Sequence, residues 1–246
     1  RLRSANISYR LVSFNRPWNQ YDYQDALAGI SGAGFDYTGL MRQQGELLVG
    51  PDTPEKKVQN LRQTVEDAGL QMDTVLGALD FSDGVDGAVA SLEKLLKNCA
   101  ALGADYFLNC GTTDEDMRQD YYTVLGEGAR IGQDLGIVVT LKAHGGITKT
   151  GEDLVQAAEA INHDNFGIYY DPGNIVHYGG YDPVEEAEIC AEHVVAMCVK
   201  DSEGQSIGVN IQPGEGVVDF AGVMEALAGG GFTEGPLLIE CLGGET

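Results

Sequence analysis

The chain of 246 residues carries 38 acidic and 15 basic residues, a formal net charge of −23. So acidic a surface would repel the phosphates of DNA or RNA, and we expect no nucleic-acid partner. Its hydrophobic content of 43% supports a substantial core, and no apolar run approaches the roughly 20 residues that cross a bilayer, so we expect no membrane partner.

Apolar, strand-like runs alternate with amphipathic, helix-like segments along the whole chain, with no linker between them. Strands are predicted at residues 7–14, 35–41, 71–79, 106–110, 137–141, 166–170, 194–199 and 237–239. Helices are predicted between them, at residues 23–33, 54–68, 85–102, 117–135, 151–161, 183–192 and 220–228. Several helices end at a glycine just before the next strand, as at Gly69, Gly103 and Gly136. This alternation predicts an α/β fold, a single (β/α)₈ barrel domain over residues 1–246.

The two ends of the chain and its cysteines carry further expectations. Only a few residues follow the last predicted strand, so we expect the barrel to lack the eighth helix. An uncovered apolar flank there favours a homo-oligomer. The five scattered cysteines form no CxxC pair, which indicates reduced thiols and a cytoplasmic setting. Since the sequence begins without Met, a processed leader also stays open.

Three of the predicted strands run directly into charged residues. One directly precedes Lys142, with His144 two residues later; another precedes Asp171, and the last precedes Glu240. In a parallel barrel the C-terminal ends of the strands share one face, where active sites lie. Charges next to buried strands are costly unless they are paired. We therefore predict that Lys142, Asp171 and Glu240 converge on one site, and that Glu240, Lys142 and His144 are catalytic.

Other polar and aromatic residues that follow predicted strands are candidate ligands of a sugar-like substrate. They are Asn15, Trp18, Arg42, Asn109, Asn174, His177 and Lys200. Several have an equally simple structural interpretation. Trp18 could plug the rim of the barrel, His177 could cap its loop, and Lys200 could pair with Asp201.

Seven short motifs run in order along almost the whole chain. They are GFD at 34–36, ALGA at 101–104, LKAHGG at 141–146, YDPGN at 170–174, VKD at 199–201, GEGVVDF at 214–220 and LIE at 238–240. Together they resemble the sugar phosphate isomerase/epimerase family, which has a xylose isomerase-like TIM barrel. The resemblance implies a sugar or cyclitol isomerase or epimerase that transfers a proton next to a carbonyl. Because the family also contains dehydratases and other lyases, a keto-sugar lyase is an alternative.

The resemblance also implies a divalent metal, from which this chain departs at two positions. Members hold the cation with a Glu, an Asp, a His and a Glu at the ends of strands five to eight. Asp171 and Glu240 match, whereas Lys142 and Cys198 occupy the other two positions. Lys142 could therefore replace the metal and stabilise an enediolate, or act as a base with a lowered pKa, while Glu240 moves the proton.

Three alternatives remain open at this stage. Lys142 could swing aside and leave Mg²⁺, Mn²⁺ or Zn²⁺ on His144, Asp171, Glu240 and Cys198. Lys142 could instead form a Schiff base in a lyase reaction. Finally, the loss of half the usual ligands could mark a non-catalytic carbohydrate-binding protein on a degenerate barrel.

Overall fold

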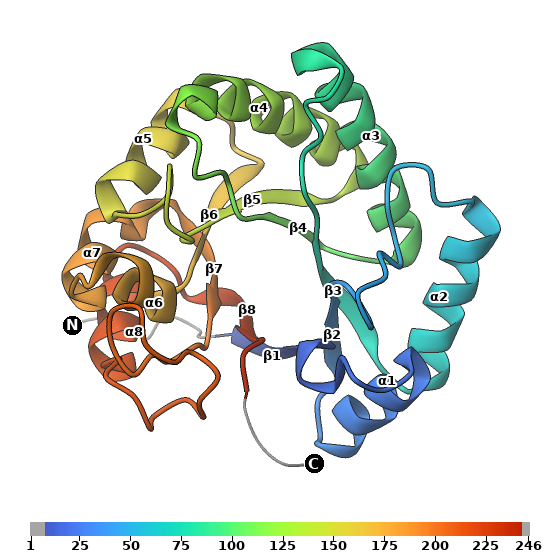
Figure 1. Ribbon diagram of the computed structural model, residues 1–246, viewed down its shortest axis with the longest axis horizontal. Helices are drawn as coiled ribbons and strands as arrows, with labels where there is room; N and C mark the ends of the chain where they lie inside the picture. The colour runs from blue at the N-terminus through green and yellow to red at the C-terminus, as the bar shows by residue number, and fades with distance from the viewer. Residues whose placement is uncertain (1–7, 243–246) are drawn as a thin grey trace.

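Eight parallel strands close into a barrel in the order β1 to β8 in the computed structural model, which describes residues 8–242 (Figure 1). They are β1 (Ser8–Phe14), β2 (Tyr37–Leu40), β3 (Gln71–Leu76), β4 (Tyr106–Asn109), β5 (Val138–Lys142), β6 (Phe166–Tyr170), β7 (Val194–Cys198) and β8 (Glu234–Ile239). The barrel closes where β1 pairs with β8, from Ser8 opposite Glu234 to Ser13 opposite Ile239. The predicted barrel is therefore confirmed; the first residue of the predicted strand 7–14 lies outside the described residues.

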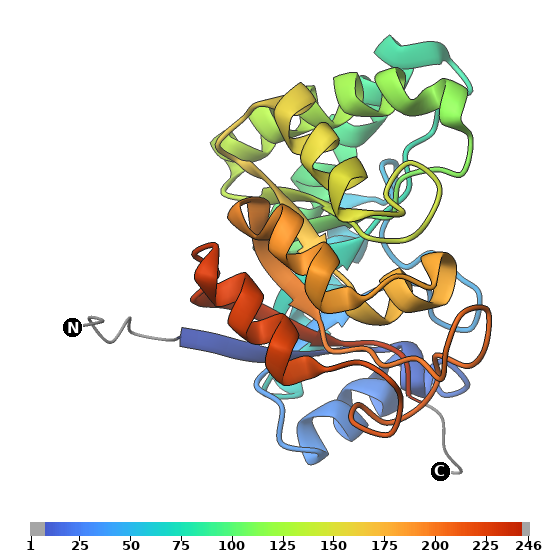
Figure 2. The ribbon, with the colours of Figure 1, turned by 90° about the vertical axis from the view of Figure 1, so that its left-hand side faces the viewer.

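Helices surround the barrel and connect successive strands (Figures 1 and 2). They are α1 (Tyr23–Gly32), α2 (Glu55–Asp67), α3 (Gly84–Leu102), α4 (Arg118–Leu135), α5 (Gly151–Ile161), α7 (Pro183–Cys190) and α8 (Phe220–Gly229). The short α6 (Pro172–Asn174) is a single turn that continues into a π-helix, Ile175–Gly179, which the sequence did not predict. Within residues 8–242 no helix follows β8, as expected, and none is long and apolar enough to span a membrane.

Local signals explain where several helices begin and end. Thr150 and Asp153 form a capping box at the start of α5: the Thr150 hydroxyl oxygen accepts from the Asp153 N–H at 3.1 Å, and the Asp153 carboxylate accepts from the Thr150 N–H at 3.2 Å. Gly103 and Gly136 follow α3 and α4 with φ of 92° and 73°, the left-handed conformation that glycine adopts without strain. These boundaries agree with the prediction because they depend on local chemistry.

Two strand boundaries were predicted wrongly by three residues, and one of them is the end of β3, expected at residue 79 but found at Leu76. The last strand was expected to begin at residue 237, but β8 begins at Glu234. Gly235 and Pro236 are typical of a turn, yet here they pair with β1. Gly235 adopts φ of 122°, and a Cβ at this position would lie 2.6 Å from the Val195 carbonyl oxygen. Close packing against β7 therefore requires a glycine inside this strand.

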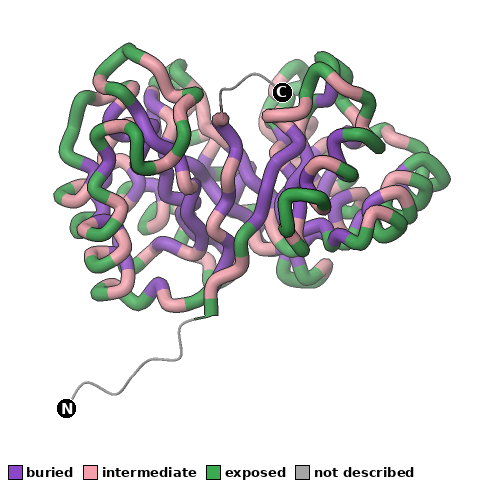
Figure 3. Tube along the Cα trace, turned by 90° about the horizontal axis from the view of Figure 1, so that it is seen from below, coloured by how far each residue is buried: buried purple, intermediate pink, exposed green. Residues whose placement is uncertain are grey.

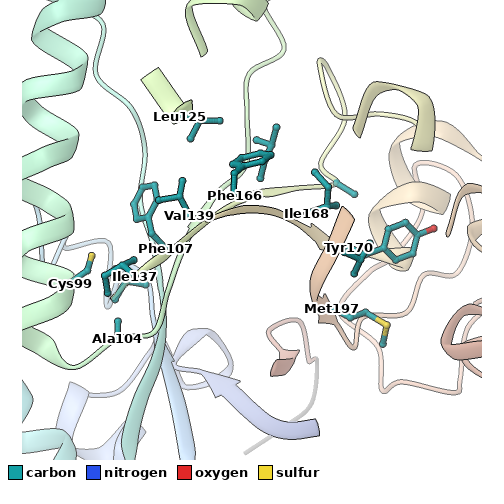
Figure 4. Packing of buried hydrophobic residues seen from close by; sticks show 14 of the residues in the cluster. Cys99, Ala104, Phe107, Leu125, Ile137, Val139, Phe166, Ile168, Tyr170 and Met197 are labelled. Carbon is teal, nitrogen blue, oxygen red and sulfur yellow. The ribbon is translucent and has the colours of Figure 1, made fainter. Parts of the chain in front are cut away.

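The strands separate two apolar regions. Inside the barrel, alternate residues form a cluster: Val12, Phe14, Leu108, Tyr169, Ala196, Cys198 and Leu238. Outside, the other residues of the same strands pack against the helices, as Phe107 and Val139 do near Cys99 and Leu125 (Figure 4). Buried backbone accordingly fills the centre of the molecule, while the outer helix faces are exposed (Figure 3). This alternation decides which side chains can reach the end of the barrel.

An ion pair fills the N-terminal end of the barrel. The Arg10 guanidinium contacts the fully buried carboxylate of Asp73 and lies between the rings of Tyr37 and Tyr106, 5.7 and 5.4 Å from their centroids. Burial, the largest effect, raises the pKa of Asp73, although Thr74 and Arg10 oppose it. Chemistry is therefore expected at the opposite end of the barrel.

Candidate active site

The strand alternation explains why charged side chains meet at the C-terminal end. Tyr169 and Leu238 belong to the interior cluster. Asp171 and Glu240 follow them by two residues, so their side chains face the same interior. Lys142, the last residue of β5, is as deeply buried as they are.

Two lysines and two carboxylates form a tight group at this end, which we call the charge quartet: Lys142, Asp171, Lys200 and Glu240. The Lys142 Nζ lies 2.9 Å from Asp171 Oδ2 and 2.5 Å from Glu240 Oε1. The Lys200 Nζ lies 3.0 Å from Glu240 Oε1 and 3.6 Å from Asp171 Oδ2. All four residues are at most 4% exposed. The structure thus brings Lys142, Asp171 and Glu240 together as the sequence predicted, while their chemical roles stay predictions.

The quartet fixes the protonation of its members. Burial alone would lower the pKa of Lys142, but Asp171 and Glu240 among its neighbours raise that pKa well above its usual value. The pKa of Lys200 is raised in the same way, mainly by Asp171. Burial opposes ionisation of Glu240, but the two ammonium groups hold its pKa well below its usual value. At neutral pH both lysines are therefore charged, which weighs against a lysine base or a Schiff base, since both need a neutral amine.

Asn174 ties the ends of three strands together. Its Nδ2 donates to the Ala143 carbonyl at 2.8 Å, and its Oδ1 accepts from Lys200 at 2.7 Å. Its backbone N–H donates to Asp171 Oδ1 at 2.9 Å. Asp171 Oδ2 is buried and accepts no hydrogen bond of ordinary geometry from the described residues, although the Lys142 ammonium lies close. That oxygen can therefore accept a hydrogen bond from a ligand.

His144 lies near the quartet, and Tyr178 lies beside both His144 and His177. The His144 Nε2 lies 3.4 Å from the Tyr178 hydroxyl, and the two rings are 4.9 Å apart. Burial, followed by the charge of Lys142, lowers the pKa of His144 to about 4, so its imidazole is neutral at pH 7. His177 meets the same tyrosine edge-on, and its buried Nδ1 has no hydrogen-bond partner among the described residues.

The side chains of two predicted substrate ligands, Asn15 and Asn109, form hydrogen bonds with other residues of the protein. Asn15 is buried; its Nδ2 donates to Gln43 Oε1 at 2.6 Å, and its Oδ1 accepts from the Met41 N–H at 2.9 Å. Asn109 donates to the Gly77 carbonyl at 2.9 Å. Both amides therefore brace loops at the C-terminal end of the barrel, and a role in substrate binding stays a prediction for each.

The remaining candidates differ in position. Arg42 is exposed and donates to the Gly45 carbonyl at 3.0 Å. The Trp18 indole packs on Gly29 of α1, where an added Cβ would lie 2.3 Å from its Nε1. This contact favours the structural interpretation of Trp18, and its role in substrate binding stays a prediction.

Lys200 forms ion pairs with Asp171 and Glu240 and not with its neighbour Asp201. Both oxygens of Asp201 instead accept backbone N–H groups, among them those of Gly214 at 2.8 Å and Gly216 at 2.9 Å. The contact between Lys200 and Glu240 was not predicted from the sequence, although the alternation of residues along the strand indicates it. Lys200 follows the interior residue Cys198 by two positions and so points inward.

A set of possible metal ligands overlaps the quartet. Ligand atoms of Asp171, Cys198 and Glu240 lie within 4.8 Å of one another and could hold an ion; His144 is not part of this set. However, the Lys142 Nζ already contacts both carboxylates. Two unit charges 4 Å apart repel by about 4 kcal/mol at an effective dielectric constant of 20, and a dication here would face two ammonium groups. The arrangement therefore does not fit a divalent cation while Lys142 keeps its place.

A family model described as "Xylose isomerase-like TIM barrel" matches residues 27–245. The inosose dehydratase of Geobacillus kaustophilus (strain HTA426) is 27% identical over 120 residues, which span 42% of this chain and only 39% of that protein.

Solved structures show the same fold at low sequence identity. D-psicose 3-epimerase with D-tagatose, from Clostridium cellulolyticum H10, superposes with a TM-score of 0.77 at 15% identity over 95% of this chain and 85% of that one. A xylose isomerase-like TIM barrel protein from Mycobacterium smegmatis, in complex with magnesium, gives a TM-score of 0.78 at 15% identity over 97% and 92%.

Proposed function

The chain belongs to the xylose isomerase-like TIM barrel family, and we propose that it is an enzyme that transfers a proton next to the carbonyl group of a sugar or cyclitol. An isomerase or epimerase is the preferred class, and a keto-sugar dehydratase or other lyase is a related one. The family resemblance and names such as D-psicose 3-epimerase and inosose dehydratase support this choice. The observation that carries it is the Lys142 ammonium between the carboxylates of Asp171 and Glu240.

In the proposed reaction, the substrate carbonyl oxygen accepts a hydrogen bond from the Lys142 ammonium. Glu240 takes the proton from the neighbouring carbon, the C–H electron pair forms a C=C bond, and the carbonyl electron pair moves to oxygen. The ammonium then stabilises the enediolate oxygen. Return of the proton to the same face of the same carbon gives exchange, and protonation of its opposite face gives epimerisation. In isomerisation the proton goes to the former carbonyl carbon, while a proton passes from the neighbouring hydroxyl to the enediolate oxygen, so that the neighbouring carbon becomes the new carbonyl.

The paired state of Glu240 has a consequence for this step. A carboxylate with a strongly lowered pKa is a weak base, so Glu240 is poorly suited to remove a proton in the resting site. A substrate oxygen that draws the Lys142 ammonium toward itself removes part of that stabilisation and raises the basicity of Glu240. Substrate binding would therefore activate the base.

Other residues are proposed to orient the substrate. Asp171 Oδ2, which accepts no hydrogen bond of ordinary geometry from the described residues, would accept one from a hydroxyl on the carbon next to the carbonyl when the substrate draws Lys142 toward itself. The neutral His144 imidazole, beside Tyr178, can donate to or accept from a second hydroxyl.

Proton exchange in D₂O tests the proposal directly. Candidate ketoses and inososes are incubated with the protein, and loss of the C–H signal beside the carbonyl is followed by NMR. We expect exchange with at least one of them, and its loss in Lys142→Met. Exchange that is unchanged in this variant would remove Lys142 from the mechanism.

A non-catalytic carbohydrate-binding protein is the second candidate. The quartet is internally neutral and almost fully buried, so a ligand reaches it only after side chains or loops move. Calorimetric binding of a sugar, without proton exchange for any sugar tested, would favour this function.

Two further predictions concern partners and location. We propose that a second copy covers the flank where β1 meets β8, because Leu11 on β1 is 55% exposed. Sedimentation analysis would test this, and a monomer at micromolar concentration would contradict it.

All five cysteines are free thiols, which supports the cytoplasmic setting predicted from the sequence.

A further inference from the structure

We propose that Lys142 and Lys200 together supply the two positive charges that a divalent cation would bring to the quartet, so that the protein works without a metal. The charge balance follows from the geometry alone, whereas catalysis without a metal rests on the function proposed above.

Each lysine contacts both carboxylates. Lys142 lies 2.9 Å from Asp171 and 2.5 Å from Glu240, and Lys200 lies 3.6 and 3.0 Å from the same oxygens. Two ammonium groups therefore balance two carboxylates in a buried volume, and the net charge of the group is zero. A single lysine would leave one carboxylate charge uncompensated, which a buried site tolerates poorly.

Neither ammonium can easily yield its place to an ion. Lys142 is 1% exposed and stands at the end of β5, so no nearby solvent could receive its charge. The Lys200 Nζ is held by Asn174, whose own amide donates to the Ala143 carbonyl after β5. A dication added to this group would raise its net charge from zero to +2 in a buried site.

The same charge rule makes a positive prediction for one substitution. Lys142→Glu changes the net charge of the four positions from zero to −2, which a divalent cation would neutralise. The new carboxylate would join Asp171, Glu240 and Cys198, whose ligand atoms already lie within 4.8 Å of one another. Oxygen donors of this kind suit Mn²⁺. The variant should therefore bind the ion that the native protein excludes.

The experiment compares the two purified proteins after chelator treatment and dialysis. Metal content is measured by mass spectrometry, and thermal unfolding is followed with and without Mn²⁺. For the native protein we expect no stoichiometric metal and no change of Tm with Mn²⁺ or with chelator. For Lys142→Glu we expect stoichiometric Mn²⁺ and a rise in Tm of about 5–10 °C at 100-fold excess over its Kd.

Lys149→Glu is the matched control, since it makes the same charge change in the loop after β5, where Lys149 lies over the Tyr181 ring. It should not acquire stoichiometric Mn²⁺. Stoichiometric metal in the native protein, or a native Tm that falls with chelator, would overturn the inference even if Lys142→Glu failed to fold. A folded Lys142→Glu that binds no Mn²⁺ would overturn it too. Absence of proton exchange with every sugar, in a metal-free native protein, would instead contradict the proposed function alone.

Discussion

The Lys142 ammonium lies 2.5 Å from Glu240 Oε1, although the two residues are 98 positions apart in the chain. Lys142 ends β5 and Glu240 follows β8, and these strands are not neighbours in the barrel. The contact therefore spans the interior and exists only because the sheet closes on itself. The charge balance of the site consequently depends on the geometry of the whole barrel.

Lys142→Met should destabilise the protein by about 3–5 kcal/mol, because it leaves two buried carboxylates with one ammonium partner. Urea unfolding at pH 7 measures the change. Lys97→Met serves as control, since Lys97 is 59% exposed and solvent screens its pair with Glu93, which therefore contributes little to stability. Equal effects of the two substitutions would show that the quartet contributes no special stability.

Glu240→Gln should lower the rate of proton exchange by about 10²–10⁴, the range typical of losing a general base. NMR exchange in D₂O with the best native substrate gives the rate. Glu234→Gln is a matched control at the other, exposed end of β8 and should leave the rate unchanged. A Glu240→Gln protein with native exchange would mean that another group removes the proton.

His144 should make stability depend on pH. Its pKa is lowered to about 4 in the folded protein, mainly by burial, whereas an unfolded histidine titrates near about 6.5. As pH falls from 6.5 to 4, the unfolded state binds the proton first, so stability decreases over this range and the loss is complete below pH 4. His144→Gln should remove up to about 2 kcal/mol of this decrease, since the side chain is partly exposed. Urea unfolding at pH 7 and 4.5 tests it; parallel decreases in both proteins would contradict it.

Asp201→Asn should loosen the loop between β7 and α8. The carboxylate accepts four backbone N–H groups, those of Ser202, Gly214, Gly216 and Val218, at 2.8–3.1 Å. An asparagine offers only one acceptor oxygen, so two donors lose their partner, at a cost of about 2–4 kcal/mol.

Hydrogen exchange of residues 202–218 should become faster in that variant. Asp219→Asn is the control, because Asp219 caps α8 at an exposed position where asparagine caps equally well. Unchanged protection of the loop in Asp201→Asn would show that other contacts hold it.

The sequence predicted the barrel because its signals are local and repeated. Strand-like runs alternate with helices, and glycines such as Gly103 and Gly136 end helices where expected. The start of β8 was misplaced because Gly235 and Pro236 resemble a turn until β1 is seen to pair with them.

The sequence by itself determined the fold class and the convergence of Lys142, Asp171 and Glu240, since strand ends share one face of a parallel barrel. Only the tertiary structure decided that Lys200 joins Glu240 and not Asp201, and that Asn174 holds Lys200 in place. These choices depend on angstrom-scale distances across the barrel, which no periodicity in the sequence encodes. They decide the net charge of the site, and through it whether a cation fits.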